Sequence, residues 1–387
     1  MRASRVSIAA VRNTAIIIAL VIAVPAIATL ASCSGPASPT ATESPSTESP
    51  SGVPATTPSP VITPTRAPLP ASPLTGLPEA SPGPVLVVKL DNTRNAQPHA
   101  GLAYADIVYI EEVEYGITRL AAVFSSTIPH RIGPVRSARI TDIDLLAQFG
   151  SPAFAYSGAQ HKLLPKLAAA SFLDISPNRG ASSYSRDFDR PAPYNYFLDG
   201  GIGLKRATDA TADHDMGFTF SQEPPIGGLP AMKLRVEWSY ASAGFTYDEV
   251  SGLYRVQLNG KRARAEEHDR GQNAATVVVQ YVTQTPSDYF DRGGGNTPHA
   301  ETVGRGRAII LRDGRSWDVN WERPDADSGT TFTRADGSPM PFKPGQQWIV
   351  LLDRDRTAKI STPSTASASP SAASPPALMG STSPSRG

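Results

Sequence analysis

The chain of 387 residues contains a single cysteine, Cys33. One thiol cannot form an intramolecular disulfide, so the sequence excludes a disulfide-stabilised scaffold and leaves the fold to its hydrophobic core. An excess of charge of one sign is also missing, because 36 Lys and Arg residues balance 35 Asp and Glu residues. This balance gives no long-range attraction to nucleic acid, and no nucleic-acid partner is predicted.

The motifs of the common nucleophilic and nucleotide-hydrolysing enzymes are missing as well. The sequence has no Gly-x-Ser-x-Gly elbow, no Walker loop and no Cys–His pairing. Its six histidines show no short paired spacing of the kind that metal sites use. The sequence therefore predicts neither a metal site nor a cofactor, and it leaves any catalytic residue unidentified.

Residues 1–33 have the composition of a secretory signal segment. Three arginines precede an uncharged apolar run from Thr14 to Leu30, and Ala31-Ser32-Cys33 follows. This order is typical of a signal peptide with a small-residue cleavage site. The string Leu30-Ala31-Ser32-Cys33 resembles the bacterial lipobox, which implies a palmitate-type lipid anchor on Cys33 at the extracytoplasmic face of the cell membrane. Two alternatives are an uncleaved membrane helix, since about 17 apolar residues can just cross a bilayer, and cleavage with release.

Proline is concentrated at the two ends of the chain. Residues 34–72 contain ten prolines among Ser, Thr and Ala, and residues 358–387 have a similar composition. Such segments bury too little apolar surface to offset the loss of conformational entropy, so we expect a disordered stalk and a disordered tail. The remaining stretch of about 285 residues is long enough for two domains.

The predicted fold class is α+β, with a mixed α/β N-terminal domain over 73–230 and a mostly antiparallel β C-terminal domain over 231–357. In the first domain, apolar runs predict strands and helical spacing predicts two helices. The strands are Val85–Leu90, Asp106–Val113, Ile117–Ser126 and Ala153–Ser157, and the helices are Thr141–Phe149 and His161–Ala170. Gly116 predicts a hairpin loop between the second and third strands.

The second domain alternates short β-rich runs with turn signals such as Asn259-Gly260 and Asp313-Gly314. The predicted strands are Lys233–Ser239, Leu253–Leu258, Ala275–Val282, Arg307–Arg312, Thr330–Thr333 and Gln347–Leu352. The glycine-rich segment 292–296 precedes no helical pattern and is predicted to be a loop.

Polar residues gather at the ends of the predicted N-terminal strands. The candidate binding residues there are Asp91, Asn92, Arg94, Glu111, Glu114, Arg119, Arg131, Arg136 and Arg139. Arg136 and Arg139 are three residues apart, so they can share one side of a helical turn and offer planar donors to a carboxylate or phosphate. Arg190 and Asn195 belong to an aromatic-rich segment, 184–196, that suits recognition of sugars, peptides or proteins, or packs on itself as a long loop.

Three interpretations of the polar cluster remain open. It forms a groove for an anionic ligand, a structural network of ion pairs, or the site of an envelope hydrolase. In the hydrolase, Asp91 with Glu111 or Glu114 would act as general acid and base on cell-wall glycan. The first interpretation describes a binding or assembly module whose partners are the membrane, through the lipid anchor, and a cell-wall component, envelope protein or anionic ligand.

Several strings of the first domain resemble the DUF3048 family, bacterial lipoproteins of unknown function. They include Val88-Lys89-Leu90-Asp91-Asn92, Gln97-Pro98-His99-Ala100-Gly101-Leu102 and, above all, Ile132-Gly133-Pro134-Val135-Arg136-Ser137-Ala138-Arg139. The second domain is similar more loosely, through Trp317 and through Pro344-Gly345 with Trp348. The resemblance covers about residues 73–355 and implies a two-domain extracytoplasmic lipoprotein, without implying a reaction.

Overall fold

The structure is a computed structural model that describes residues 69–79, 81–268 and 271–362. The predicted signal peptide, the predicted acylation site Cys33 and most of the predicted stalk and tail lie outside the described residues. In the part that is described, no helix is both long and apolar enough to cross a membrane.

The described residues contain a main sheet of twelve strands. Its central order is β18-β17-β16-β14-β19-β2-β3-β1-β4-β5, with β15 paired to β14 and β8 paired to β17. The strands are β1 (Leu86–Asp91), β2 (Ile107–Glu112), β3 (Thr118–Phe124), β4 (Ala153–Ala155), β5 (Leu173–Asp174), β8 (Leu229–Pro230), β14 (Thr276–Phe290), β15 (Asn296–Glu301), β16 (Gly304–Arg312), β17 (Arg315–Arg323), β18 (Thr331–Thr333) and β19 (Gln347–Asp353).

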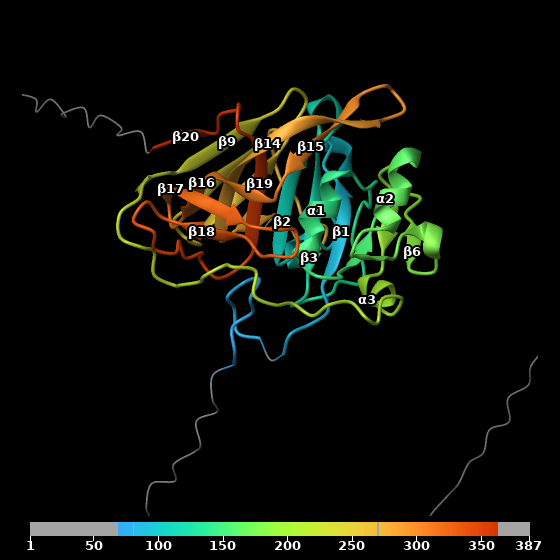
Figure 1. Cartoon of the computed structure of the whole chain (residues 1–387), viewed down its shortest axis with the longest axis horizontal. Coiled ribbons are helices and arrows are strands. Elements are labelled where there is room, and N and C mark those ends of the chain that lie inside the picture. Colours follow the sequence, from blue (N-terminus) through green and yellow to red (C-terminus); the bar gives the residue numbers. More distant parts are fainter. Residues whose placement is uncertain (1–68, 80, 269–270, 363–387) are drawn as a thin grey trace, which may run out of the picture. The chain divides into compact units, whose positions relative to one another are not determined.

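Strands from the two halves of the sequence join in the middle of this sheet. The late strand β19 lies between β14 and the early strand β2, and it runs parallel to both (Figure 1). Residues 347–350 of β19 pair with residues 107–110 of β2. The sheet is thus continuous across residue 230, where the sequence predicts a domain boundary, and that boundary remains a prediction.

Apolar residues cover both faces of the main sheet, which explains why its central strands are nearly continuous hydrophobic runs. Along β1, Leu86, Val88 and Leu90 belong to one core, and Val87 belongs to the core on the opposite face. Because side chains alternate along a strand, each strand supplies both cores.

A second sheet of six strands covers the first of these faces, as far as the described residues show. Its strands are β9 (Lys233–Glu237), β10 (Ser242–Asp248), β11 (Leu253–Leu258), β12 (Lys261–Arg262), β13 (Asn273–Ala274) and β20 (Lys359–Ser361). The turn predicted at Asn259-Gly260 is confirmed, since it joins β11 to β12 with φ of 54° and 78°. Positive φ at both central residues is typical of a type I′ hairpin, and Asp313-Gly314 forms the same kind of turn between β16 and β17.

Short helices and loops pack on the opposite face. Leu145 and Leu146 of the first helix and Leu167 of the second enter that core. The α-helices are α1 (Thr141–Ala147), α2 (Leu164–Ala168) and α3 (Gly200–Leu204), and the small sheet pairs β6 (Tyr184–Arg186) with β7 (Tyr196–Leu198). Single 3-10 turns are η1 (Arg94–Ala96), η2 (Leu102–Tyr104), η3 (Glu114–Gly116), η4 (His161–Leu163) and η5 (Pro177–Arg179).

Sheets dominate the described residues, of which 41% lie in strands and 11% in helices, so helices contribute less than the predicted α+β class suggests. Strand β10 was not predicted, nor were β15 and β17. Strand β20 begins at Lys359, beyond the predicted start of the tail at residue 358, because Ile360 packs on the core and pairs with β9. At the N-terminal end of the described residues, Ala71 of the predicted stalk forms a β-bridge with Pro78 of the predicted first domain.

Candidate functional site

The central strands change from apolar to charged at one end of the main sheet. On β1, Val87 is followed on the same face by Lys89 and Asp91, and on β3 Arg119 precedes Ala121. Arg119 stands in register with Asp91 on one side and with Glu111 on the other. Strand alternation therefore brings four charged side chains to one face of three adjacent strands.

Lys89 forms a closed, buried cluster with two carboxylates. Its Nζ lies 2.7 Å from Oδ1 of Asp142 and also contacts Glu111. All three side chains are buried, and the burial lowers the pKa of Lys89 to about 8 although the charge of Asp142 opposes this. The Arg139 amide N–H donates to the other oxygen of Asp142 at 2.6 Å. Glu111, predicted to lie in the groove, is instead part of this closed cluster, because α1, which supplies Asp142, covers this part of the sheet face.

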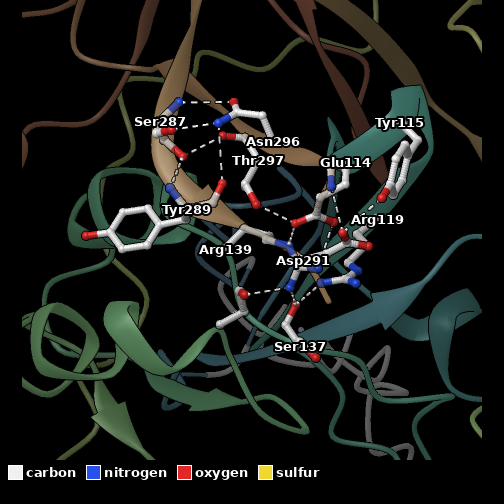
Figure 2. Close-up of polar contacts among 12 residues, drawn as sticks. Glu114, Tyr115, Arg119, Ser137, Arg139, Ser287, Tyr289, Asp291, Asn296 and Thr297 are labelled. Atoms are coloured by element: carbon white, nitrogen blue, oxygen red, sulfur yellow. Dashed lines mark hydrogen bonds and ion pairs between the residues drawn. The ribbon is translucent and has the colours of Figure 1, made fainter. Parts of the chain in front are cut away.

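Next to this cluster lies a cavity of about 800 Å³. We call it the arginine pocket; its charged lining residues are Glu114, Arg119, Arg136, Arg139, Asp291 and Arg292. The first four were predicted as binding residues, and the structure brings them together at the sheet end. Figure 2 shows three of them, Glu114, Arg119 and Arg139, side by side. The lining also includes His161 at the start of η4.

Arg119 is the most deeply buried arginine of the pocket. Its side chain is only 6% exposed, and its Nη1 donates to the carbonyl oxygen of Ser137 at 2.6 Å. Its Nε donates to no described residue, and no described carboxylate forms an ion pair with it. Burial and the positive charge of Arg139 lower the pKa of Arg119 to about 9. An arginine that is buried without an ion-pair partner is favourable only where an anion can approach it.

Arg136 and Arg139 are already paired with carboxylates. Arg139 binds Glu114 through two nitrogens, with Nε 2.5 Å from Oε1 and Nη2 donating to Oε2 at 2.7 Å (Figure 2). Arg136 Nε donates to Oδ2 of Asp91 at 2.8 Å. With Asp291 and Arg292 counted, four arginines face three carboxylates, and the site has an excess positive charge.

Glu114 is held in its ionised form. Burial alone would raise its pKa, but the hydrogen bonds and charge of Arg139, with the hydroxyl of Thr297, lower the pKa below its ordinary value. A general acid at neutral pH needs a raised pKa, so Glu114 is poorly suited to that role. Asp91 is occupied by Arg136 and Glu111 is buried, so the hydrolase interpretation has no free pair of carboxylates here.

The prediction that Arg136 and Arg139 share a helical turn is wrong. The segment is extended: the Arg136 N–H donates to the Lys89 carbonyl, and the Arg136 carbonyl accepts from Ser157 N–H. The segment therefore lies alongside the end of β1, and its backbone hydrogen bonds are made to β1 and to the residues that follow β4 instead of within a helix.

The tip of the β14–β15 hairpin closes one side of the pocket. Tyr115, in η3, donates from its hydroxyl to Oδ1 of Asp291 at 3.1 Å (Figure 2). A Cβ at Gly295 would lie 2.5 Å from the Tyr115 ring, so glycine is needed for the hairpin to approach that closely. Asp291 and Arg292 were missed by sequence analysis, because they lie about 180 positions from their neighbours and no local pattern marks them.

Three predicted residues lie in a separate cluster. Arg131 pairs with Asp187 at 2.6 Å and with Glu266 at 2.7 Å, and its guanidinium carbon lies 3.6 Å from the centre of the Phe197 ring. Arg190 lies near the same Glu266 and donates to a backbone carbonyl at 2.8 Å, and Asn195 accepts from Arg186 at 3.0 Å. This cluster fixes the loop between β6 and β7 by ion pairs.

Asn92 and Arg94 line another cavity, on the opposite face of the main sheet. In the described ranges, no group of three or more His, Cys, Asp or Glu side chains is arranged to hold a metal ion.

The fold and the pocket together define a class: a strand-rich protein whose main sheet combines both halves of the chain and ends in an arginine-lined pocket. The sequence comparison identifies the family. Residues 74–215 match the "Protein of unknown function (DUF3048) N-terminal domain", and residues 234–349 match the corresponding C-terminal domain. The chain belongs to the DUF3048 family, which confirms the resemblance predicted from its sequence.

A curated relative is the Bacillus subtilis (strain 168) protein named "Putative lipoprotein YerB". It is 26% identical over 293 residues, covering 72% of this chain and 83% of the relative. The crystal structure of YerB protein from Bacillus subtilis matches with a TM-score of 0.63 and 22% identity, covering 76% of this chain and 99% of that one. The structural match shows that the two proteins share a fold.

Proposed function

We propose that this chain is a lipoprotein held by acylated Cys33 at the extracytoplasmic face of the cell membrane, where its arginine pocket binds an anionic ligand of the envelope. One observation carries the binding proposal: the guanidinium of Arg119 is buried, has no ion-pair partner among the described residues and belongs to a side chain that lines an open cavity.

The lipid anchor is supported by two independent observations. The single cysteine stands at the one position that a lipobox requires, directly after an apolar run. The relative YerB also carries the word lipoprotein in its name. Stable anchoring of this kind needs two acyl chains or one chain with a second membrane contact.

The ligand class follows from the donors of the pocket. Guanidinium groups present planar N–H donors that match the oxygens of a phosphate or carboxylate, and Arg136 and Arg119 approach the cavity from different elements. Because Glu114, Asp91 and Asp291 offset only three of the four arginine charges, an anion with one or two charges brings the site close to neutrality.

Isothermal titration of the purified full-length protein with pyrophosphate and with citrate, at fixed ionic strength, tests the proposal and separates the two anion classes. We expect saturable binding of at least one of them. Arg119→Met should weaken it roughly 10- to 100-fold, since hydrogen bonds to charged groups contribute about 1.5–3 kcal/mol.

The matched control is Arg307→Met. Arg307 forms an ion pair with Asp318 at 2.6 Å on the surface and does not line the pocket. This variant should bind like the unmodified protein. Failure of both anions to saturate the protein, or equal affinities in the two variants, would refute the binding proposal.

A further inference from the structure

A second cavity, of about 660 Å³, lies at the same end of the main sheet but on the other face. Thr118 lines this cavity, whereas the next residue of β3, Arg119, lines the arginine pocket. Strand alternation explains the separation, because successive side chains point to opposite faces. We call it the β9–β10 cavity, after the hairpin turn that forms its other wall.

This hairpin turn is fixed by backbone hydrogen bonds. The Trp238 N–H donates to the Ala241 carbonyl at 2.9 Å, and the Tyr240 N–H donates to the Gly116 carbonyl in η3 at 3.0 Å. Gly116 has a φ of 70°, and a Cβ there would lie 2.9 Å from the Ser239 side chain. The cavity wall is therefore held in place before any ligand arrives.

Two buried polar atoms of the lining residues have no partner. The indole Nε1 of Trp238 donates to no described residue, and Oδ1 of Asn92 accepts from none. The Asn92 Nδ2 atom is already used, because it donates to Thr118 Oγ1 at 2.8 Å. Buried indole N–H groups usually have a partner, so the unpaired donor and acceptor on these two lining residues are the groups that a polar ligand in this cavity would satisfy.

The rim of the cavity adds an aromatic surface and planar polar groups. Tyr240 is 77% exposed, Arg94 forms no ion pair with a described residue, and Arg235 pairs with Glu237 at 2.8 Å. A sugar ring offers an apolar face of C–H groups for an aromatic ring, together with hydroxyls that both donate and accept.

We propose that the β9–β10 cavity binds a saccharide. The sugar ring packs on Tyr240, and a hydroxyl or acetamido group enters the cavity to accept from Trp238 Nε1 and donate to Asn92 Oδ1. Trp238 is 6% exposed and Asn92 is 2% exposed, so this group must enter the cavity to reach them. The site uses no residue of the arginine pocket and stands independently of the anion-binding proposal.

Titration calorimetry of the full-length protein with chitotetraose and with cellotetraose tests this site. The two tetrasaccharides differ in whether an acetamido group or a hydroxyl stands at C2 of each ring. We expect saturable binding of chitotetraose, of cellotetraose or of both. Tyr240→Ala should weaken binding about tenfold by removing the stacking surface, and Trp238→Phe should weaken it about three- to tenfold by removing one donor.

Trp317→Phe is the matched control. Trp317 is also buried, and its Nε1 also lacks a described partner, but it lies on β17 and does not line the cavity. This variant and Arg119→Met should both bind the sugar normally. The proposal is overturned if neither tetrasaccharide binds saturably, or if folded Trp238→Phe and Tyr240→Ala proteins bind as tightly as the Trp317→Phe protein.

Discussion

Replacing Lys89 by methionine removes an ammonium group from the interior while keeping a similar side-chain length. The change leaves the carboxylates of Glu111 and Asp142 buried, with exposed side-chain fractions of 1% and 0%. Asp142 keeps the amide N–H of Arg139, but Glu111 loses its ion-pair partner and already has one oxygen without a partner. Removing one member of a buried ion pair destabilises proteins by about 3–5 kcal/mol, and we expect a loss of that size.

Chemical denaturation at neutral pH, followed by tryptophan fluorescence, measures this loss as a change in the free energy of unfolding. Lys359→Met is the control, because Lys359 pairs with Glu237 at the surface, where the two side chains are 68% and 44% exposed. Such surface pairs contribute at most about 1 kcal/mol. The double variant Lys89→Met/Glu111→Met should lose less stability than the sum of its two single changes, because it also removes the carboxylate of Glu111 that Lys89→Met leaves without an ion-pair partner.

The reasoning is refuted if Lys89→Met costs no more than Lys359→Met. Glu111 would then not depend on Lys89 for compensation, and its assignment to a closed structural cluster instead of the ligand site would be wrong.

Three further predictions concern the pocket, the core and the anchor. The pKa of folded Glu114 lies below its unfolded value of about 4.5, so the stability that its ionised form contributes is present above that pH and is lost as the pH falls through the folded pKa. When urea denaturation is compared between about pH 5 and about pH 3, the free energy of unfolding should therefore fall less for Glu114→Gln than for the unmodified protein. Phe342→Ala should cost about 3–5 kcal/mol in the same assay, because the Phe342 ring is fully buried 4.8 Å from that of Phe218, and a loss below about 1 kcal/mol would contradict this packing. Cys33→Ser should move the protein from the membrane fraction to the soluble fraction, with the unmodified protein showing an acylated Cys33 by mass spectrometry; membrane association without Cys33 would contradict the lipid anchor.

The strands of the main sheet were predictable where both faces are buried, because apolar runs such as 85–90 and 347–352 leave no other interpretation. Strand β10 was not, since only Ala243 and Phe245 of its seven residues are buried and their alternation is short. The order of the strands in the sheet could not be predicted from the sequence either. The parallel pairing of β19 with β2 joins segments that are about 240 residues apart, and no local pattern encodes it.

The candidate site was predicted in part for the same reason. Glu114 follows the end of β2 and Arg119 stands near the start of β3, so their approach could be expected from the hairpin. Arg136 and Arg139 lie between β3 and α1, and their extended path beside β1 could not be read from the local sequence. The pairing of Glu111 with Lys89 could not be distinguished from a groove position, because alternation gives the face but not what covers it. The helix α1, which supplies Asp142, determines that Glu111 is buried.

The central claim is that Arg119 is a buried cation positioned to receive an anion. A crystal structure of the protein soaked with whichever of pyrophosphate or citrate binds more tightly tests this most directly. The account predicts an anion oxygen within about 3 Å of the Arg119 guanidinium, with the Glu114–Arg139 pair retained. An anion bound elsewhere, or an Arg119 side chain that has turned to pair with Glu114 in a pocket containing only water, would contradict it.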